Sequence, residues 1–293
     1  MTDAPTPIPT NKKHPSRRTV ILCAVGLAVL TALIAWIVWG NTALEVNTYT
    51  VTSDKLPTAF CGFRIAQVSD LHNAELGEGN ERLLAALREA SPNIIVITGD
   101  MIDSRNTNVE IALDFAKDAV GIAPCYYVTG NHEARTSAYA ALKKGLLEAG
   151  VTVLEDARVE LERDGDSITL IGVNDPSRSS GNEATTMERT LSRLTETDGG
   201  YTVLLSHRPE LMEVYTECGV DLVFSGHAHG GQVRLPLVGG LAAPNQGLFP
   251  RYDGGIYTQG DTRMAVSRGL GNSIIPVRIG NRPEVVVVEL ATP

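Results

Sequence analysis

The feature of this sequence that most constrains its fold is the position of its histidines. Five of the six histidines follow short apolar runs that are typical of buried β-strands. The runs span residues 64–69, 94–98, 125–129, 202–205 and 222–225, and the polar groups that follow are Asp70-Leu71-His72, Gly99-Asp100, Gly130-Asn131-His132, Ser206-His207 and Gly226-His227-Ala228-His229. Imidazoles and carboxylates placed repeatedly at the ends of buried strands indicate a metal site assembled from several strand ends.

The segments between these runs predict the fold class. Apolar residues at helical spacing indicate helices over 80–90, 109–120, 137–149 and 184–194. Alternation of strands and helices favours parallel pairing in a sheet that helices cover. Further strands are indicated over 44–51 (an edge strand), over 159–162 and 167–173 (a hairpin at Asp164-Gly165), and between 263 and 290, ending at 285–288. We predict an α/β fold, a four-layer α/β/β/α sandwich of two mixed sheets.

The N-terminal part of the chain predicts a membrane helix. Residues 19–39 form an uncharged apolar run, long enough to span roughly 30 Å of hydrocarbon. Basic residues precede this run, and two tryptophans lie at its far end, so the positive-inside rule places the N-terminus in the cytoplasm. The predicted organisation is a cytoplasmic basic tail (1–18), a transmembrane helix or signal anchor (19–39), a linker with the edge strand (40–60) and a catalytic domain (61–293).

Two alternatives to an uncleaved anchor remain open. A cleaved signal peptide is one, although the apolar run is longer than the usual ~7–15-residue signal core and no convincing A-x-A site follows it. The second is twin-arginine export, since Ser16-Arg17-Arg18 resembles such a signal. A pair of arginines before a membrane helix is also a common topology signal.

Charge and cysteine content exclude some classes of function. Without the four Lys and Arg residues and the one Asp that precede the apolar run, 21 basic and 33 acidic side chains remain, a net charge of −12. Such a domain repels nucleic acid, so we expect no nucleic-acid partner. Of the four cysteines, Cys23 lies in the apolar run and the other three lack metal-type spacing. Cys125 is expected to be a small core residue.

The chemistry of the strand-end residues favours two metal ions. Asp70 and His72 are two residues apart, so in an extended backbone both side chains point the same way, and His227 and His229 repeat the arrangement. Carboxylates, an amide and imidazoles suit Mn²⁺, Fe or Zn²⁺. About seven such ligands are too many for one tetrahedral ion, whereas two ions that share a carboxylate fit them.

These motifs, taken together and in order, resemble the signature of the calcineurin-like metallophosphoesterases. The motifs are Asp70-x-His72, Gly99-Asp100-x-x-Asp103, Gly130-Asn131-His132-Glu133, His207 and Gly226-His227-x-His229. The resemblance covers about residues 60–290, and the segment 226–257 more narrowly resembles the bacterial membrane-linked or exported branch of that family.

The resemblance implies a role for each motif residue. Asp70, His72 and His229 would bind one metal, Asp100 would bridge the pair, and Asn131, His207 and His227 would bind the second. The cofactors would be two divalent ions, Mn, Fe or Zn, with Mn favoured. A hydroxide that bridges the metals would attack phosphorus. His132 would act as general acid on the leaving oxygen or hydrogen-bond the phosphate, and Asp103 and Glu133 would orient ligands.

The resulting hypothesis is a dimetal-dependent hydrolase of phosphate ester or pyrophosphate bonds. It would be a single-pass protein of the cell membrane that acts at the outer face. Its partners would be the lipid bilayer and a phosphate-containing substrate, with lipid-linked phosphates as candidates. The alternative is a non-catalytic metal-binding scaffold of the same fold, although such scaffolds usually lack ligands that this chain keeps. Arg234 and Arg251 are weaker candidates for contacts to substrate phosphate, and Asp175 is expected to be structural.

Overall fold

The computed structural model describes residues 16–195, 199–272 and 275–293. Most of the predicted basic tail, residues 1–15, lies outside the described part of the chain. By its internal contacts the chain divides into two compact units, Met1–Trp39 and Gly40–Pro293. The first contains most of helix α1 (Arg17–Thr42), whose most apolar stretch has a mean hydropathy of 2.7, long and apolar enough to cross a membrane. The second unit contains the two sheets.

The first sheet has six strands in the order β1-β16-β2-β3-β4-β5. Its members are β1 (Glu45–Thr52), β2 (Arg64–Val68), β3 (Ile94–Thr98), β4 (Cys125–Val128), β5 (Thr152–Val153) and β16 (Glu284–Ala291). The strands β2 to β5 run parallel, as the alternation of strands and helices predicts. Strand β1 lies at the edge, parallel to β16, and β16 runs antiparallel to β2.

The second sheet also has six strands, in the order β14-β15-β9-β8-β7-β6. Its members are β6 (Ala157–Arg163), β7 (Asp166–Gly172), β8 (Thr202–Leu205), β9 (Leu222–Ser225), β14 (Gly255–Gln259) and β15 (Thr262–Val266). The pair β6–β7 forms the predicted hairpin at Asp164-Gly165. Strands β7, β8, β9 and β15 run parallel, so both sheets are mixed, as predicted.

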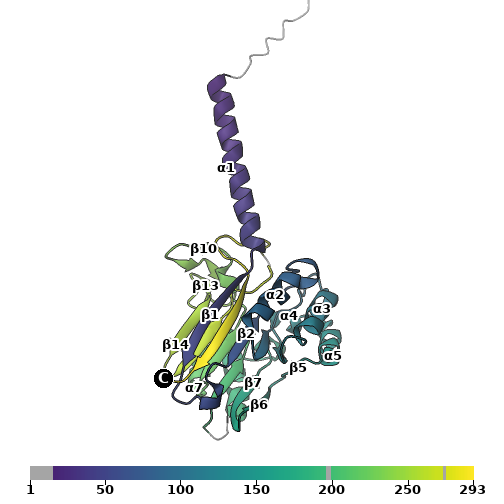
Figure 1. Cartoon of the computed structure of the whole chain (residues 1–293), viewed down its shortest axis with the longest axis vertical. Helices are drawn as coiled ribbons and strands as arrows, with labels where there is room; N and C mark the ends of the chain where they lie inside the picture. Colours follow the sequence, from purple (N-terminus) through teal and green to yellow (C-terminus); the bar gives the residue numbers. More distant parts are fainter. Residues whose placement is uncertain (1–15, 196–198, 273–274) are drawn as a thin grey trace, which may run out of the picture. The chain divides into compact units, whose positions relative to one another are not determined.

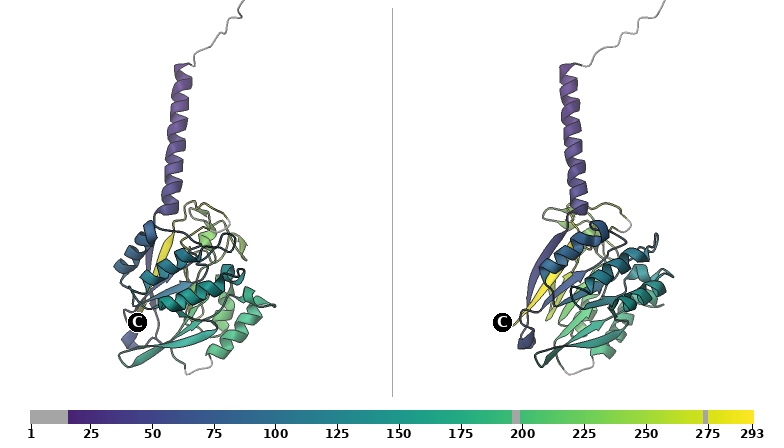
Figure 2. Two further views of the ribbon diagram at one scale, coloured as in Figure 1. Left: turned by 90° about the vertical axis from the view of Figure 1, so that its right-hand side faces the viewer. Right: turned by 45° about the vertical axis from the view of Figure 1, so that its right-hand side comes forward.

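Three apolar cores hold these elements together; Figures 1 and 2 show the helices and sheets that they join. One lies between the first sheet and helices α2 (Glu81–Ala90), α3 (Val109–Ala119) and α5 (Tyr139–Ala149). The second contains side chains of both sheets, and the third lies between the second sheet and helices α6 (Glu183–Thr195) and α7 (Met212–Glu217). Along β3, Ile95 and Ile97 enter the first core while Ile94 and Val96 enter the second, because successive side chains of a strand point to opposite faces.

The structure differs from the sequence prediction at two places. The helix expected over 137–149 is α5, but a short helix that was not predicted, α4 (Asn131–Ala134), precedes it directly after Gly130. The segment 230–250 contains two short hairpins, formed by β10 (Arg234–Leu235) with β11 (Gly239–Gly240) and β12 (Ala242–Ala243) with β13 (Gly247–Leu248). Two-residue strands are too short to give a periodic signal.

Candidate metal centre

The predicted metal ligands all lie at carboxyl ends of parallel strands. Asp70 and His72 follow β2, Asp100 follows β3, and Asn131 follows β4, all in the first sheet. In the second sheet, His207 follows β8, while His227 and His229 follow β9. Hydrogen bonds between the sheets join these ends, because His207 Nδ1 lies 2.7 Å from the carbonyl oxygen of Thr98 and the His227 N–H donates to the Asp70 carboxylate.

The backbone at these ends is not extended, which corrects the reason expected for the convergence of the side chains. Asp70, His72, Asp100, His227 and His229 all have left-handed φ values, between 46° and 65°. This conformation costs roughly 1–2 kcal/mol for each residue other than glycine. Strain of this kind persists where the surrounding structure over-determines it, and it concentrates at functional sites. Tight turns, rather than the alternation of an extended strand, therefore direct these side chains to one point.

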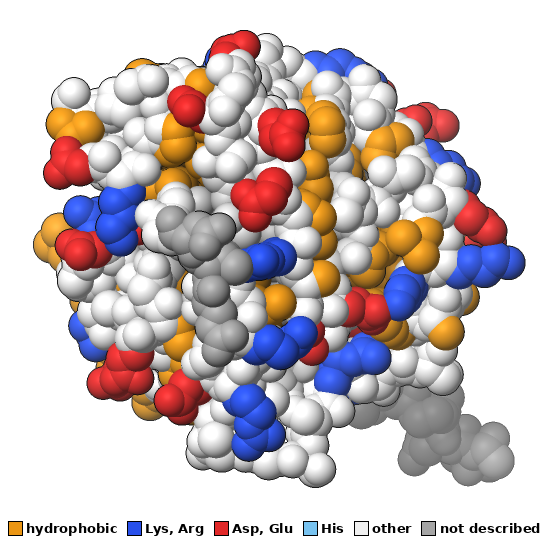
Figure 3. Space-filling view, turned by 90° about the horizontal axis from the view of Figure 1, so that it is seen from below, with side chains coloured by type: hydrophobic (Ala, Val, Ile, Leu, Met, Phe, Trp, Pro, Cys, Tyr) orange, Lys and Arg blue, Asp and Glu red, His pale blue; other side chains and the backbone are white. Residues whose placement is uncertain are grey.

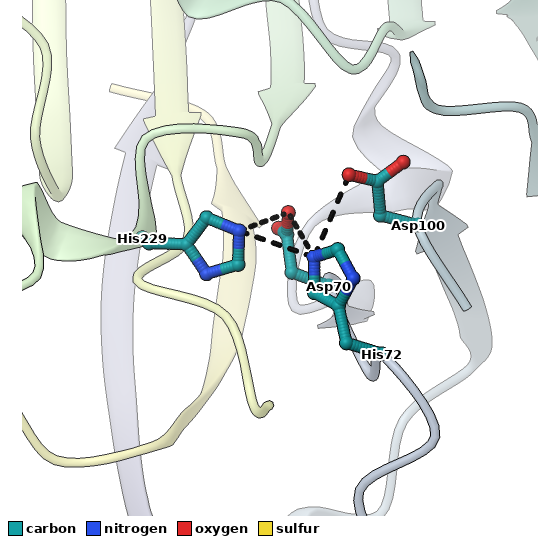
Figure 4. A group of neighbouring side chains, drawn as sticks. All are labelled: Asp70, His72, Asp100 and His229. Atoms are coloured by element: carbon teal, nitrogen blue, oxygen red, sulfur yellow. Dashed lines mark hydrogen bonds and ion pairs between the residues drawn. The ribbon is translucent and has the colours of Figure 1, made fainter. Parts of the chain in front are cut away.

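Four of the side chains form a first buried cluster (Figure 4). Ligand atoms of Asp70, His72, Asp100 and His229 all lie within 4.8 Å of one another. The His72 and His229 Nε2 atoms are 3.1 Å apart, and the His229 Nε2 lies 3.3 Å from Asp70 Oδ1. Two imidazole nitrogens that converge on two carboxylates present the donor set of a divalent cation site.

A second cluster shares Asp100 with the first. Asp100, His207 and His227 again offer ligand atoms within 4.8 Å of one another, with the His207 Nε2 3.2 Å from Asp100 Oδ2. Because a carbonyl oxygen faces the Nδ1 of His207, the proton of the neutral ring lies on Nδ1 and leaves Nε2 as an electron-pair donor.

Unpartnered atoms test whether a metal fits this second cluster. The Nε2 atoms of His207 and His227 and the Oδ1 of Asn131 are buried and have no hydrogen-bond partner among the described residues. Unsatisfied buried polar atoms are rare in folded proteins and call for a partner such as an ion. The two clusters together therefore fit a pair of divalent ions bound by oxygen and nitrogen, with Asp100 available to both.

Burial and neighbouring charges determine the protonation states of the residues in both clusters. Burial by itself would raise the pKa of Asp70 and Asp100, but the surrounding imidazoles outweigh this effect and hold both pKa values below the usual range. Burial lowers the pKa of His227, and it lowers that of His229 to about 3. Ionised carboxylates beside neutral imidazoles are the forms that bind metal. His72 and His207 differ, because Asp70 and Asp100 outweigh their burial. The pKa of His72 is raised and that of His207 is raised to about 10, so metal binding to these rings would displace protons.

His132 lies against the first cluster, and its ligand atom lies within 4.8 Å of those of His72 and Asp103, which form a third group of possible metal ligands among the described residues. Its ring meets that of His72 edge-on, with 4.5 Å between the centroids. The Ser104 backbone N–H donates to its Nδ1 at 3.0 Å, and Asp103 Oδ1 lies 3.8 Å from the same atom. Nδ1 is therefore an acceptor, which places the proton of the neutral ring on Nε2. Burial lowers the pKa of His132 and favours this neutral form.

Glu133 and Asp103 both accept hydrogen bonds that fix loops of the site. The Glu133 carboxylate accepts backbone N–H bonds from Asp100, Gly130 and Ile102 at 2.8–3.2 Å, which ties the β3 and β4 loops together. Burial and the nearby Asp100 raise the pKa of Glu133 to about 7. Asp103 accepts from the backbone N–H and the guanidinium of Arg105.

Two buried arginines support the site, and the sequence analysis missed both. Arg208, next to His207, donates to both carboxylate oxygens of Asp175 at 2.5 and 3.0 Å. Arg278 donates to the carbonyls of Arg268 and Gly271, and the Gly271 N–H in turn donates to the Asp70 carbonyl. Proximity to His207 was a signal for Arg208, whereas Arg278 is distant in sequence from every motif.

The two arginines named as candidates for phosphate contact are placed differently. Arg234 is paired with Asp253 at 3.0 Å and also donates to the Gly230 carbonyl. Arg251 is exposed, and its guanidinium lies 5.1 Å from the ring centroid of Tyr252. Asp175, expected to be structural, caps the turn Pro176–Arg178 besides holding Arg208.

The cysteines contribute nothing to either cluster. All four are free, and Cys125 is part of the first apolar core. Burial raises its pKa to about 12, so the thiol stays protonated and is not a metal ligand at neutral pH.

Comparison with known proteins identifies relatives of the whole domain. The chain is 34% identical over 254 residues to the uncharacterized metallophosphoesterase YkuE of Bacillus subtilis (strain 168), which covers 84% of this chain and 85% of that protein. It is 29% identical to the phosphodiesterase YaeI of Escherichia coli (strain K12), covering 78% and 82%. A transmembrane protein with metallophosphoesterase domain from Danio rerio is 28% identical, covering 81% of this chain and 55% of that protein.

A solved structure supports the fold. The crystal structure of TT1561 of Thermus thermophilus matches with a TM-score of 0.50 at 12% identity, covering 71% of this chain and 90% of that one. The family model for calcineurin-like phosphoesterase matches residues 63–231, which contain every residue of both clusters. The chain therefore belongs to the calcineurin-like phosphoesterase family and is a metal-dependent hydrolase of that family.

Proposed function

We propose that this chain hydrolyses phosphate ester or pyrophosphate bonds with two divalent metal ions. In this proposal Asp70, His72 and His229 hold the first ion, and Asn131, His207 and His227 hold the second. The observation that carries it is the position of Asp100, whose carboxylate lies within reach of both clusters. A shared carboxylate between two sets of ligands is what a closely spaced metal pair requires.

The expected chemistry of the ions follows from their charge. Bound there, two divalent cations would supply a water activated at neutral pH and positive charge beside the phosphoryl oxygens. Manganese is favoured, because oxygen and imidazole ligands suit it and no thiolate is present among the residues of the two clusters. Glu133 would hold the two loops that carry Asp100 and Asn131, so that these ligands keep their separation during turnover.

His132 would act on the substrate rather than on a metal. With its Nδ1 occupied by the Ser104 N–H, the ring presents Nε2–H as a hydrogen-bond donor. This favours a hydrogen bond to a substrate phosphoryl oxygen or to the departing oxygen. Complete proton transfer to the leaving group, the general-acid role, would need a doubly protonated ring and loss of the Ser104 bond.

The domain would act at the outer face of the cell membrane, on substrates near the lipid surface. Arg17 and Arg18 precede the apolar stretch of α1 and no basic residue lies in its last turn, which favours a cytoplasmic N-terminus. The resemblance to a transmembrane protein with a metallophosphoesterase domain supports membrane attachment. A short tether concentrates the catalytic domain at the bilayer, so lipid phosphates and lipid-linked diphosphates are the favoured substrate class.

Metal content and hydrolysis of a soluble diester test the proposal, using the full chain in detergent. We expect about two metals per chain by elemental analysis and hydrolysis of bis-p-nitrophenyl phosphate with Mn²⁺. Asp100→Asn should lose both metals and abolish hydrolysis, because it removes the shared carboxylate. Asp114→Asn, which alters an exposed carboxylate paired with Lys117, is the matched control and should retain both.

Two results would contradict the proposal. Two metals that persist in Asp100→Asn would show that this carboxylate does not bridge. A folded, metal-loaded chain that hydrolyses neither this diester, nor p-nitrophenyl phosphate, nor a pyrophosphate would instead favour the non-catalytic scaffold.

A further inference from the structure

The exposed apolar side chains of the second unit gather on one set of loops. Outside helix α1, eight large hydrophobic residues of the described chain are exposed, and six of them lie on the two short hairpins and the segment beside them. We name these six the apolar tip: Leu235, Leu237, Val238, Leu248, Phe249 and Ile275. Leu237 is fully exposed, Leu248 is 69% exposed and Phe249 is 60% exposed. Clustered exposed apolar residues of this kind mark an interaction surface.

Hydrogen bonds link the apolar tip to the start of the domain. The Arg234 N–H donates to the Ile279 carbonyl at 2.9 Å, so the first hairpin pairs with the segment around Ile279. The next residue back, Arg278, exchanges two bonds with the Asn41 side chain, at 2.7 and 2.9 Å. Asn41 is two residues beyond Trp39, the end of the apolar run. Two residues span at most about 7 Å, so the segment that pairs with the first hairpin is bonded to a residue that the backbone keeps within this distance of Trp39.

The backbone of the apolar tip is strained without any gain in packing. Leu237 and Phe249 have left-handed φ values of 67° and 55°. This conformation is disfavoured for side chains of their size and is tolerated by Gly and Asn. Asn245, in the same loops, has φ 59° and is such a residue. Both side chains remain largely exposed, so burial within the domain does not offset the cost of the strained backbone. This favours their burial in a surface outside the domain.

The charge around the apolar tip indicates what kind of surface could cover it. In Figure 3, which views the domain from the end opposite β10 and β13, acidic and basic side chains are interspersed across the surface. Residues 235–249, which carry five of the six tip residues, contain no charged side chain. Of the two flanking arginines, Arg234 is paired with Asp253 and Arg251 is exposed. The chain after residue 18 carries a net charge of −12, so its overall charge does not favour binding to anionic lipid. Apolar side chains with an aromatic residue among them suit the boundary between headgroups and acyl chains.

The apolar tip is continuous with the metal centre. The turn His229–Gly231 leads directly into the first hairpin, and Asn281 Nδ2 donates to the His229 carbonyl at 2.7 Å. The Leu241 N–H donates to the Gly231 carbonyl, and the Phe249 N–H donates to the Leu241 carbonyl. A partner surface that binds the two hairpins would therefore also position the loop that carries His229.

We propose that the apolar tip inserts into the surface of the bilayer and presents the metal centre to phosphates at headgroup level. The inference rests on the proposed function, in that the chain is taken to be membrane-anchored and to cleave a phosphoester. It adds to the favoured substrate class, lipid phosphates and lipid-linked diphosphates, the surface that would bring such a lipid to the metal centre. The partner proposed for the apolar tip is lipid, and contact with a second copy of the chain is the alternative.

Depth measurements with a spin label test the insertion directly. The full chain, with Cys23, Cys61 and Cys218 replaced by Ser, is reconstituted in phosphatidylcholine vesicles and labelled at Leu237→Cys. The matched control is Leu147→Cys, an exposed leucine of helix α5 outside the tip. We expect the label at 237 to be accessible to oxygen and protected from a water-soluble nickel chelate, and the label at 147 to show the reverse.

Two results would overturn the proposal. Equal access of the nickel chelate at both positions would leave the tip in water. Protection from both reagents, with dipolar broadening between labels, would assign the tip to contact with a second copy.

A kinetic comparison tests the consequence for substrate. For Leu237→Asn with Phe249→Asn, hydrolysis of bis-p-nitrophenyl phosphate in detergent should stay within twofold of wild type. Hydrolysis of phosphatidyl-p-nitrophenol in phosphatidylcholine vesicles should fall at least tenfold, and Leu147→Asn should change neither. Equal rates on the lipid for variant and wild type would contradict the inference. If wild type cleaves neither substrate, the proposed function fails while the spin-label result still decides whether the tip inserts.

Discussion

The metal centre and the apolar tip both contain residues in left-handed backbone, yet their surroundings are opposite. At the metal centre the strained residues, such as Asp70 and His227, are polar and buried, and hydrogen bonds from neighbouring loops hold them. At the apolar tip the strained Leu237 and Phe249 are apolar and exposed. Strain in the first region is balanced by buried hydrogen bonds within the domain, whereas in the second the strained side chains remain largely exposed.

This difference indicates which kind of function each region has. A strained, buried, polar loop indicates chemistry inside the protein, and its loss should be costly for both stability and activity. A strained, exposed, apolar loop indicates a contact with another medium, and its loss should leave the isolated domain intact. The following substitutions test the two halves of this comparison.

The largest effect is expected on turnover at the metal centre. His132→Ala should lower the rate by roughly 10²–10⁴-fold while metal content stays the same, because the ring acts on substrate. His132→Gln keeps an N–H donor without a titratable ring and should recover at least tenfold over the alanine variant. Steady-state rates and elemental analysis of both variants are the measurements. Equal losses in the two variants would favour proton transfer, and metal loss in either would make His132 a ligand.

The next effect concerns the ion pair behind His207. Asp175→Asn leaves the buried Arg208 without its main partner, so we expect a loss of about 3–5 kcal/mol in the free energy of unfolding at pH 7. Asp164→Asn, in the exposed hairpin turn, should cost less than about 0.5 kcal/mol. Denaturant unfolding of the metal-free chain measures both, and equal values would show that the pair adds nothing.

The same pair predicts a pH dependence. Burial tends to raise the pKa of Asp175, but Arg208 outweighs it and leaves the pKa below its ordinary value. A carboxyl whose folded pKa is depressed adds stability above its unfolded pKa of about 3.9, and that stability is lost as the pH falls toward the folded pKa. The stability difference between wild type and Asp175→Asn should therefore be constant near neutral pH and shrink below about pH 4. A difference that grows on acidification would contradict this assignment.

The smallest effects come from a matched pair of glycines. A Cβ at Gly226 would overlap the Ser69 hydroxyl and the Asp70 carboxylate, so Gly226→Ala should cost about 1–3 kcal/mol and reduce metal content. Gly247, in the second hairpin, has φ 71° and open space around its Cβ position. Gly247→Ala should therefore cost at most about 1–2 kcal/mol, from backbone strain alone, and leave metal content unchanged. Metal loss in Gly247→Ala would mean that the two regions are more tightly coupled than proposed.

Much of the fold could be predicted from the sequence. The apolar runs predicted strands β2, β3, β4, β8 and β9, and the Asp-Gly turn predicted the β6–β7 hairpin, because these signals are local. The helix boundaries at α2, α3 and α6 agree within one residue with the expected ranges. The short hairpins and the separate helix α4 could not be predicted, because elements of two to four residues carry too little periodicity.

The sequence predicts which residues gather at each sheet edge. Parallel strands of one sheet end at the same edge, so the polar residues after β2, β3 and β4 lie together, and so do those after β8 and β9. The packing of the two sheets then brings the two edges together. Their individual roles as ligands stay a prediction, which metal analysis will decide. How their side chains converge depends on tertiary contacts, because left-handed turns direct them and hydrogen bonds from loops far apart in sequence hold these turns. The tertiary structure also pairs Arg278 with the Gly271 carbonyl and with the Asn41 side chain. Such pairings depend on packing between distant segments, which no local pattern encodes.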